Sequence, residues 1–136
     1  MDNPDLAELI IGRGLLFVTL IPAGVLLIWV ARAGADGRLK RNMLAGIRVR
    51  STMTSESAWL AAHQASRWHT EAAGWCSLAA GLFVLLPVPI GTVGVVVLVG
   101  VGVMLALVVY GAVVGSRAAR NATVSGNSES ATESER

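Results

Sequence analysis

Hydrophobic residues gather in two long runs along the chain, and a polar segment separates them. The first run, residues 14–31, contains no charged residue, and neither does the second run, residues 72–116. A helix rises about 1.5 Å per residue, so the second run would be about 67 Å long as a single helix. The hydrocarbon core of a bilayer is only about 30 Å thick. The second run therefore predicts two membrane spans that turn back on one another.

The turn between these two spans is expected at residues 87–91, where two prolines and a glycine stand close together. Proline removes a backbone donor and clashes with the preceding helical turn, so a helix ends near it. The predicted spans are therefore about 10–31, 69–86 and 92–115. Arg13 lies in the first span, and we expect its side chain to reach back to the membrane surface.

The polar connector, residues 32–68, is predicted to begin as a loop and to become a helix in its second half. Thr54 or Ser55 suits the N-cap position, and the carboxylate of Glu56 suits the first helical turn. From there the helix is expected to run through Trp59 into the second span. The ring of Trp59 is expected at the membrane interface, where one edge is wet and the rest is apolar.

The C-terminal segment has a different composition from the rest of the chain. From residue 121 onward it consists mainly of Ser, Thr, Asn, Gly and Glu, and it has too few apolar residues to bury, so residues 121–136 are expected to be disordered. The sequence thus predicts an all-α membrane protein with a single polytopic domain, residues 1–120. That domain contains three transmembrane helices and a cytoplasmic connector helix between the first and the second.

The composition is typical of packed membrane helices, since 54% of the residues are hydrophobic, 15% are charged and only 5% are aromatic. About a quarter of the residues in a soluble domain are charged. Small residues let helices approach closely in lipid. They form one strip on the second span and another on the third: Gly74, Ser77 and Gly81, then Gly111 and Gly115. We expect the two strips to face each other across the hairpin, or alternatively to form the seam of a homo-oligomer.

Basic residues indicate how the spans are oriented. The connector carries seven of them: Arg32, Arg38, Lys40, Arg41, Arg48, Arg50 and Arg67. Residues 1–13 carry one, the hairpin carries none, and Arg117 and Arg120 follow the last span. The positive-inside rule places the connector and the C-terminus in the cytoplasm and the N-terminus outside, in a multi-pass plasma-membrane protein. The net charge of +2 is too small to indicate a nucleic-acid partner, whereas the basic residues beside apolar runs indicate the lipid surface.

Residues capable of metal or acid–base chemistry do not converge in the sequence. His63 and His69 are six positions apart, which is about 600° around a helix, so they point to different faces. Arg67 and Glu71 are four positions apart and predict an ion pair on one helix face. Paired carboxylates and a nucleophile–base arrangement are missing, so we expect no metal, no cofactor and no enzymatic activity, including action on lipid or peptidoglycan precursors.

The connector also contains an ordered set of residues: Asn42, Gly46, Ile47, Arg48, Thr52, Ser55, Trp59 and His63. Asn42 favours a turn, Gly46 permits backbone angles closed to other residues, and Arg48 can bind lipid phosphate or a carboxylate. Written as Asn-x3-Gly-Ile-Arg, then Thr-x2-Ser-x3-Trp-x3-His, the set resembles the signature of the SdpI-type family of bacterial membrane immunity proteins. The chain is similar to the short, three-span form of that family.

The resemblance implies a polytopic inner-membrane protein that gives resistance to a secreted toxic peptide. It also implies signalling, in which the presence of the peptide is relayed to a cytoplasmic transcriptional regulator. Under this hypothesis Asn42, Arg48, Thr52 and Trp59 organise the connector against the membrane. The alternative is a small structural or assembly subunit of a membrane complex, in which the strips of small residues would matter more than the connector.

Overall fold

The computed structural model describes residues 4–41, 46–47 and 49–134 and contains three helices and no strand within them. The helices are α1 (Pro4–Ala35), α2 (Glu56–Phe83) and α3 (Ile90–Ser134). The all-helical class predicted from the sequence is therefore confirmed.

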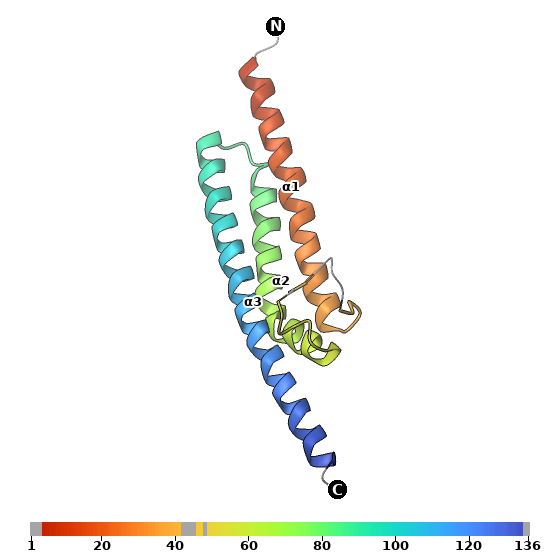
Figure 1. The fold of residues 1–136 in the computed structure, drawn as a ribbon. Coiled ribbons are helices and arrows are strands. Elements are labelled where there is room, and N and C mark those ends of the chain that lie inside the picture. Colours follow the sequence, from red (N-terminus) through yellow and green to blue (C-terminus); the bar gives the residue numbers. More distant parts are fainter. Residues whose placement is uncertain (1–3, 42–45, 48, 135–136) are drawn as a thin grey trace.

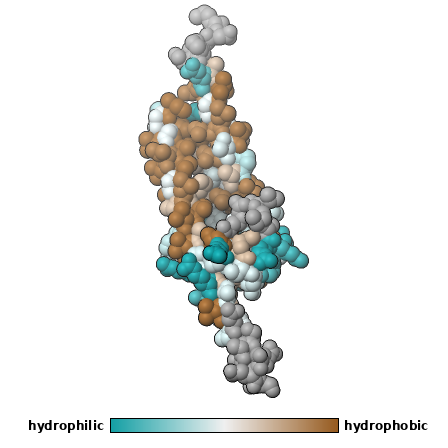
Figure 2. All heavy atoms as spheres, viewed as in Figure 1, coloured by the Kyte–Doolittle hydropathy of each residue, from teal (hydrophilic) through white to brown (hydrophobic). Residues whose placement is uncertain are grey.

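The three helices lie side by side, with α2 between α1 and α3 (Figure 1). The α2–α3 turn lies at the same end as the N-terminus, and the α1–α2 connector lies at the end from which α3 runs on to the C-terminus. Both α1 and α3 are long and apolar enough to cross a membrane, over Leu6–Ala35 and Ile90–Gly126 respectively. Figure 2 shows the matching surface, a hydrophobic band between two hydrophilic ends.

The start of α2 follows from its local sequence. Ser55 has an extended backbone, and its hydroxyl oxygen accepts a hydrogen bond from the N–H of Ala58 at 3.1 Å. This bond satisfies one of the free donors of the first turn, where Glu56 also places its negative charge. The predicted N-cap is thus confirmed. The described part of the connector contains no separate helix, because its helical half is the beginning of α2 itself.

The turn between α2 and α3 spans residues 84–89 and includes both prolines of the predicted turn. The guanidinium of Arg13 donates to three carbonyl oxygens there: Val84 at 2.8 Å, Leu86 at 2.7 Å and Val88 at 2.5 Å. The side chain of Arg13 thus reaches the turn between α2 and α3. Carbonyls at a helix C-terminus lack intrahelical partners, so they offer acceptors to the charge at this turn.

The strip of small residues on α2 packs against α1. A Cβ atom at Gly74 would lie 2.8 Å from the carbonyl oxygen of Gly24, and one at Gly81 would meet Leu20 at 3.1 Å. Between them, the hydroxyl of Ser77 donates to the carbonyl oxygen of Leu20 at 2.8 Å. The absence of bulky side chains lets the two backbones approach closely, as is common between helices in lipid.

The strip on α3 packs against a different face of α2. A Cβ atom at Gly111 would lie 3.1 Å from the side chain of His69, and one at Gly115 would lie 2.8 Å from the carbonyl oxygen of Ala62. The expectation that the two strips face each other is therefore wrong. Because α2 lies between the other two helices, its own strip of small residues faces α1, and the strip of α3 packs against the side of α2 that faces α3.

The C-terminal part of α3 also differs from the prediction, because the helix continues to Ser134 instead of becoming disordered after Asn121. Hydroxyl groups bond back to the preceding turn, from Thr123 to the carbonyl oxygen of Ala119 at 3.0 Å and from Ser125 to that of Asn121 at 3.2 Å. Adding residues to an existing helix avoids the unfavourable nucleation step. The composition of the tail alone could not predict this, because the stabilisation comes from the preceding part of α3.

Candidate functional site

Thr52 closes the turn that leads the connector into α2. Its side chain is fully buried. The hydroxyl donates toward the carbonyl oxygens of Ile47, at 2.7 Å, and Val49, at 2.9 Å. It also accepts a hydrogen bond from the backbone N–H of Val49 at 3.2 Å. The backbone N–H of Thr52 donates back to the same Val49 carbonyl at 3.0 Å. A buried hydroxyl needs such partners, so Thr52 and this turn require one another.

Trp59 lies inside the protein rather than at the membrane interface. Its side chain is 1% exposed, and its indole N–H donates to the carbonyl oxygen of Leu39 at 2.8 Å. The expectation that Trp59 is an interfacial anchor is therefore wrong, whereas Trp68 and Trp75 are exposed on the outside of α2. Through Leu39, the ring of Trp59 binds the start of the connector to the first turns of α2.

His63 lies at the centre of the connector residues. Its ring is tilted by 34° against the ring of Trp59, with 4.3 Å between their centres. Its Nε2 atom accepts a hydrogen bond from the backbone N–H of Ile47 at 3.3 Å, and Nδ1 lies 2.9 Å from the carbonyl oxygen of Trp59. An N–H donor on one side and a carbonyl acceptor on the other assign the proton to Nδ1. The geometry thus selects a neutral imidazole.

The surroundings of His63 also favour its neutral form. Burial lowers the pKa of His63 below the ordinary value of 6.5, and the hydrogen bond to the Trp59 carbonyl opposes this shift. Burial has the larger effect because the charged ring would lose its hydration. His63 is therefore neutral at neutral pH, with both ring nitrogens engaged by the backbone.

Two glycines make room for the His63 ring. Gly46 has a φ of 102°, and a Cβ atom there would contact Nε2 of His63 and the ring of Trp59. A Cβ atom at Gly34, near the end of α1, would contact the other edge of the His63 ring. Only glycine combines this positive φ with such close contact. Gly34 was missed from the sequence, where it stands between Ala33 and Ala35 without a signal of its own.

The connector reaches α3 as well. A Cβ atom at Gly115 would lie 2.8 Å from the side chain of Ile47, so the two are in close contact. Ile47 thus bonds to α2 through its backbone and packs on α3 through its side chain. Asn42 and Arg48, the other two members of the predicted set, lie outside the described residues.

An ion-pair network joins α1 to α2 beside this site. Glu71 accepts from Arg32 at 2.5 and 3.0 Å and lies 3.7 Å from Arg67, which is the pair predicted from the sequence. Arg67 also lies 3.6 Å from Asp36, just after α1. The sequence did not identify Arg32 as a partner, because this contact joins residues 39 positions apart.

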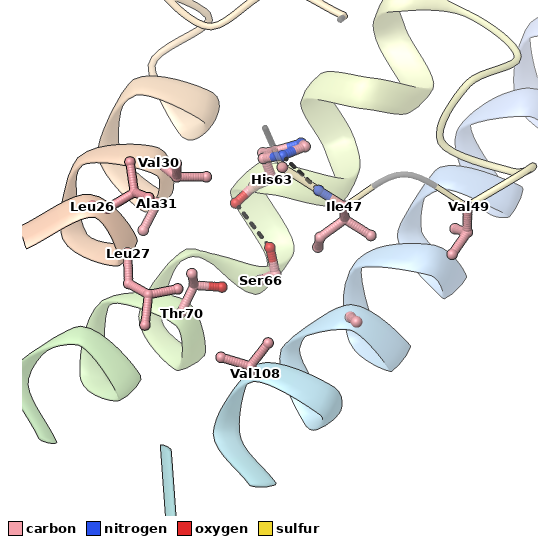
Figure 3. Close-up of a pocket in the computed structure, with 12 residues that line it drawn as sticks. Leu26, Leu27, Val30, Ala31, Ile47, Val49, His63, Ser66, Thr70 and Val108 are labelled. Carbon is pink, nitrogen blue, oxygen red and sulfur yellow. Dashed lines mark hydrogen bonds between the residues drawn. The ribbon is translucent and has the colours of Figure 1, made fainter. Parts of the chain in front are cut away.

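A groove opens between α1 and α3, and its floor is α2. Figure 3 shows side chains of α1 on one side, Val108 of α3 on the other, and His63, Ser66 and Thr70 between them. Residues 46, 47 and 49 of the connector close one end, and the volume is about 370 Å³. This volume lies within the range of pockets that hold small ligands.

The contacts of this site join the connector to the helices. Among the residues that the structure describes, no three His, Cys, Asp or Glu side chains lie close enough together to hold a metal ion. The nitrogens of His63 bond to backbone groups rather than to a nucleophile, and general base catalysis needs reach to a substrate proton. The site can instead hold the connector and all three helices in one arrangement.

The profile of the SdpI/YfhL protein family matches residues 38–114, more than half of the chain. The match begins in the connector, includes its motif residues from Gly46 to His63, and continues through α2 into α3. No curated protein and no solved structure gives a significant match.

Proposed function

The chain belongs to the SdpI/YfhL protein family, and from that membership we propose that it protects its cell against a membrane-active peptide. The family is one of non-enzymatic membrane proteins of the immunity type. The observation that carries the proposal is the position of the match, which covers the whole connector motif, all of α2 and α3 as far as residue 114. A simple anchor would not need a connector built in this way.

The proposal includes three membrane spans. α1 and α3 have the length and apolar composition required, and α2 lies between them with 28 residues, more than the roughly 20 that a span needs. Two polar residues in the second half of α2, Glu71 and Ser77, are buried against α1. The basic connector then lies in the cytoplasm, with the N-terminus and the α2–α3 turn outside.

In this arrangement the connector detects changes among the helices. Leu39 and Ile47 of the connector bond to Trp59 and His63 of α2, and Ile47 also packs on Gly115 of α3. Gly34, at the end of α1, lies against the ring of His63. A peptide that inserts beside the helices and shifts one of them changes these contacts at the cytoplasmic face. A cytoplasmic regulator that binds the connector in only one state would receive the signal by a shift of population.

The test is a protection assay in a host that lacks the gene, challenged with a panel of membrane-active peptides and secreted culture fluids. Wild-type protein should restore growth against at least one of them. Thr52→Val removes the hydroxyl that closes the connector turn, so we expect protection to be lost while the protein remains in the membrane. Thr92→Val is the matched control, because Thr92 is exposed at the opposite end of the protein.

Full protection by the Thr52→Val protein would contradict the proposed role of the connector. The alternative, an assembly subunit of a membrane complex, predicts a different pattern. A partner would then co-purify in fixed ratio, and Gly111→Leu would abolish activity while Thr52→Val would not.

A further inference from the structure

The groove between α1 and α3 is apolar along its walls and open to one side. α1 contributes Leu26, Leu27 and Val30, and α3 contributes Val108 and Ala112. α1 and α3 pack on α2 but contact each other weakly at most, so the groove faces the surroundings of the bundle. In a membrane these surroundings are the acyl chains of lipids, so an acyl chain is the group nearest to the groove.

A second pocket of about 420 Å³ adjoins the groove at its connector end. It is lined by Arg50, Ser51 and Thr54 of the connector and by Arg120 of α3. Val49 lines both the groove and this second pocket, so the two are neighbours. Together they form an apolar slot, one end of which is lined by arginine, serine and threonine residues.

The two arginines of this pocket are available to a ligand. Both are exposed, and among the described residues no carboxylate lies within ion-pair distance of either. Thr54 holds the connector beside α3, because its hydroxyl lies 3.3 Å from that of Thr123, one helical turn beyond Arg120. Arg50 and Arg120 thus come together from positions 70 residues apart in the sequence to form one basic site.

We propose that this composite site binds one anionic phospholipid. Its acyl chain lies in the groove between α1 and α3, and its phosphate lies between Arg50 and Arg120. Arginine forms paired, charge-assisted hydrogen bonds with phosphate, and basic pockets between helices on the cytoplasmic side are suited to anionic headgroups. The proposal uses only the membrane orientation from the proposed function and does not depend on immunity.

The two arginines and the apolar groove beside them together favour a phospholipid over other occupants. A peptide segment or a second copy of the chain could fill an apolar groove, but neither requires a phosphate site at its end. A free phosphate would use the arginines and leave the groove empty. A phospholipid matches both halves at once, with the polar half at the bilayer surface and the apolar half within it.

The test is native mass spectrometry of the purified full chain in detergent, with phosphatidylglycerol and phosphatidylcholine of identical acyl chains. We expect one retained phosphatidylglycerol per chain and phosphatidylcholine binding weaker by about tenfold. The double variant Arg50→Gln with Arg120→Gln should weaken phosphatidylglycerol binding by about tenfold. The control, Arg38→Gln with Arg117→Gln, removes the same charge outside the pocket and should bind as wild type does.

A second pair of variants tests the groove. Val108→Trp fills it and should prevent lipid retention, whereas Val109→Trp adds the same ring on the exposed side of α3 and should not. The helix content of both variants is compared by circular dichroism, and the arginine variants, which alter exposed side chains, test the site independently of packing.

Equal binding of the two lipids, or undiminished binding by the Arg50 and Arg120 double variant, would overturn the proposal. Displacement of the lipid by free glycerol phosphate at equal concentration would also overturn it, because the groove would then contribute nothing. A change of oligomeric state in the Val108→Trp protein without loss of lipid would instead assign the groove to a second copy. Lipid binding without protection counts against the proposed function alone, and protection without lipid binding counts against this site alone.

Discussion

The backbone N–H of Ile47 donates to Nε2 of His63 across 3.3 Å, so the position of the connector depends on an unprotonated nitrogen in α2. The proton of the ring is on Nδ1, which faces the carbonyl oxygen of Trp59 at 2.9 Å. Protonation of Nε2 would turn the acceptor into a donor and set two N–H groups against each other. The connector and the charge of His63 are therefore linked.

We expect the protein to become less stable as the pH falls below the ordinary histidine value of 6.5. Burial lowers the pKa of His63 in the folded state, so the unfolded state binds the proton more readily. The stabilisation is complete above pH 6.5 and is lost as the pH falls toward the lowered pKa of the folded state. The measurement is thermal unfolding in detergent micelles, from about pH 8 to about pH 5.

The control for this pH dependence is the other histidine. His69→Gln should retain the loss of stability at low pH, because its ring packs edge-on against Tyr110 and does not bond to the connector. His63→Gln should unfold at a lower temperature with a flatter pH profile. If the two variants show the same profile, the assignment to His63 is wrong.

Gly46→Ala should destabilise the protein by about 1–3 kcal/mol. The φ of 102° disfavours any side chain, and the new methyl group would contact the rings of His63 and Trp59. The matched control is Gly94→Ala, where a Cβ atom would meet nothing within 4 Å. Because Gly94 lies in α3, this control should be neutral or stabilising by up to about 1 kcal/mol. Chemical or thermal unfolding of the two variants side by side gives the comparison.

The packing of α1 on α2 gives a third prediction. Gly24→Ala places a methyl group 2.8 Å from the carbonyl oxygen of Gly74, so the helices must separate, at a cost of about 1–3 kcal/mol. Gly12→Ala changes the same helix where nothing lies within 4 Å, and it should be neutral or stabilising by up to about 1 kcal/mol. Equal unfolding temperatures for the two variants would contradict the close contact.

Glu71→Gln should lower the unfolding temperature, because it leaves Arg32 and Arg67 without the carboxylate that both contact. Asp36→Asn is the control in the same network, where the carboxylate is half exposed and its loss should have a smaller effect. Combining Glu71→Gln with Arg32→Gln should cost less than the sum of the two single changes. Additive losses would show that the two side chains do not interact.

The features of the fold that could be predicted from the sequence depend on local signals. Ser55 and Glu56 specify a helix start within four residues, and the prolines at 87 and 89 exclude a continuous helix. The order of helices then follows from the hydrophobic runs. The helical tail was missed because its stability depends on the preceding part of α3 and not on its own composition.

The features of the site that were not predicted depend on contacts between distant residues. From the sequence, Trp59 resembles a tryptophan at the membrane interface. In the structure its N–H bonds to the carbonyl oxygen of Leu39, 20 positions earlier, and this partner could not be read from the local sequence. Gly34 has no signal of its own, and only the His63 ring beside it explains why a side chain would not fit. Gly46 was identified because glycine permits backbone angles that are closed to other residues, and its φ is indeed 102°.

The guanidinium of Arg13 finds its acceptors between 71 and 75 positions later in the chain. If α1 spans the membrane as proposed, it enters the bilayer with a charge whose partners have not yet been synthesised. An arginine within a lone transmembrane segment is costly, so the early intermediate should remain close to the insertion machinery or to water. Under the proposed topology, the contacts of Arg13 form at the outer surface, and they can form only after the α2–α3 turn has been made.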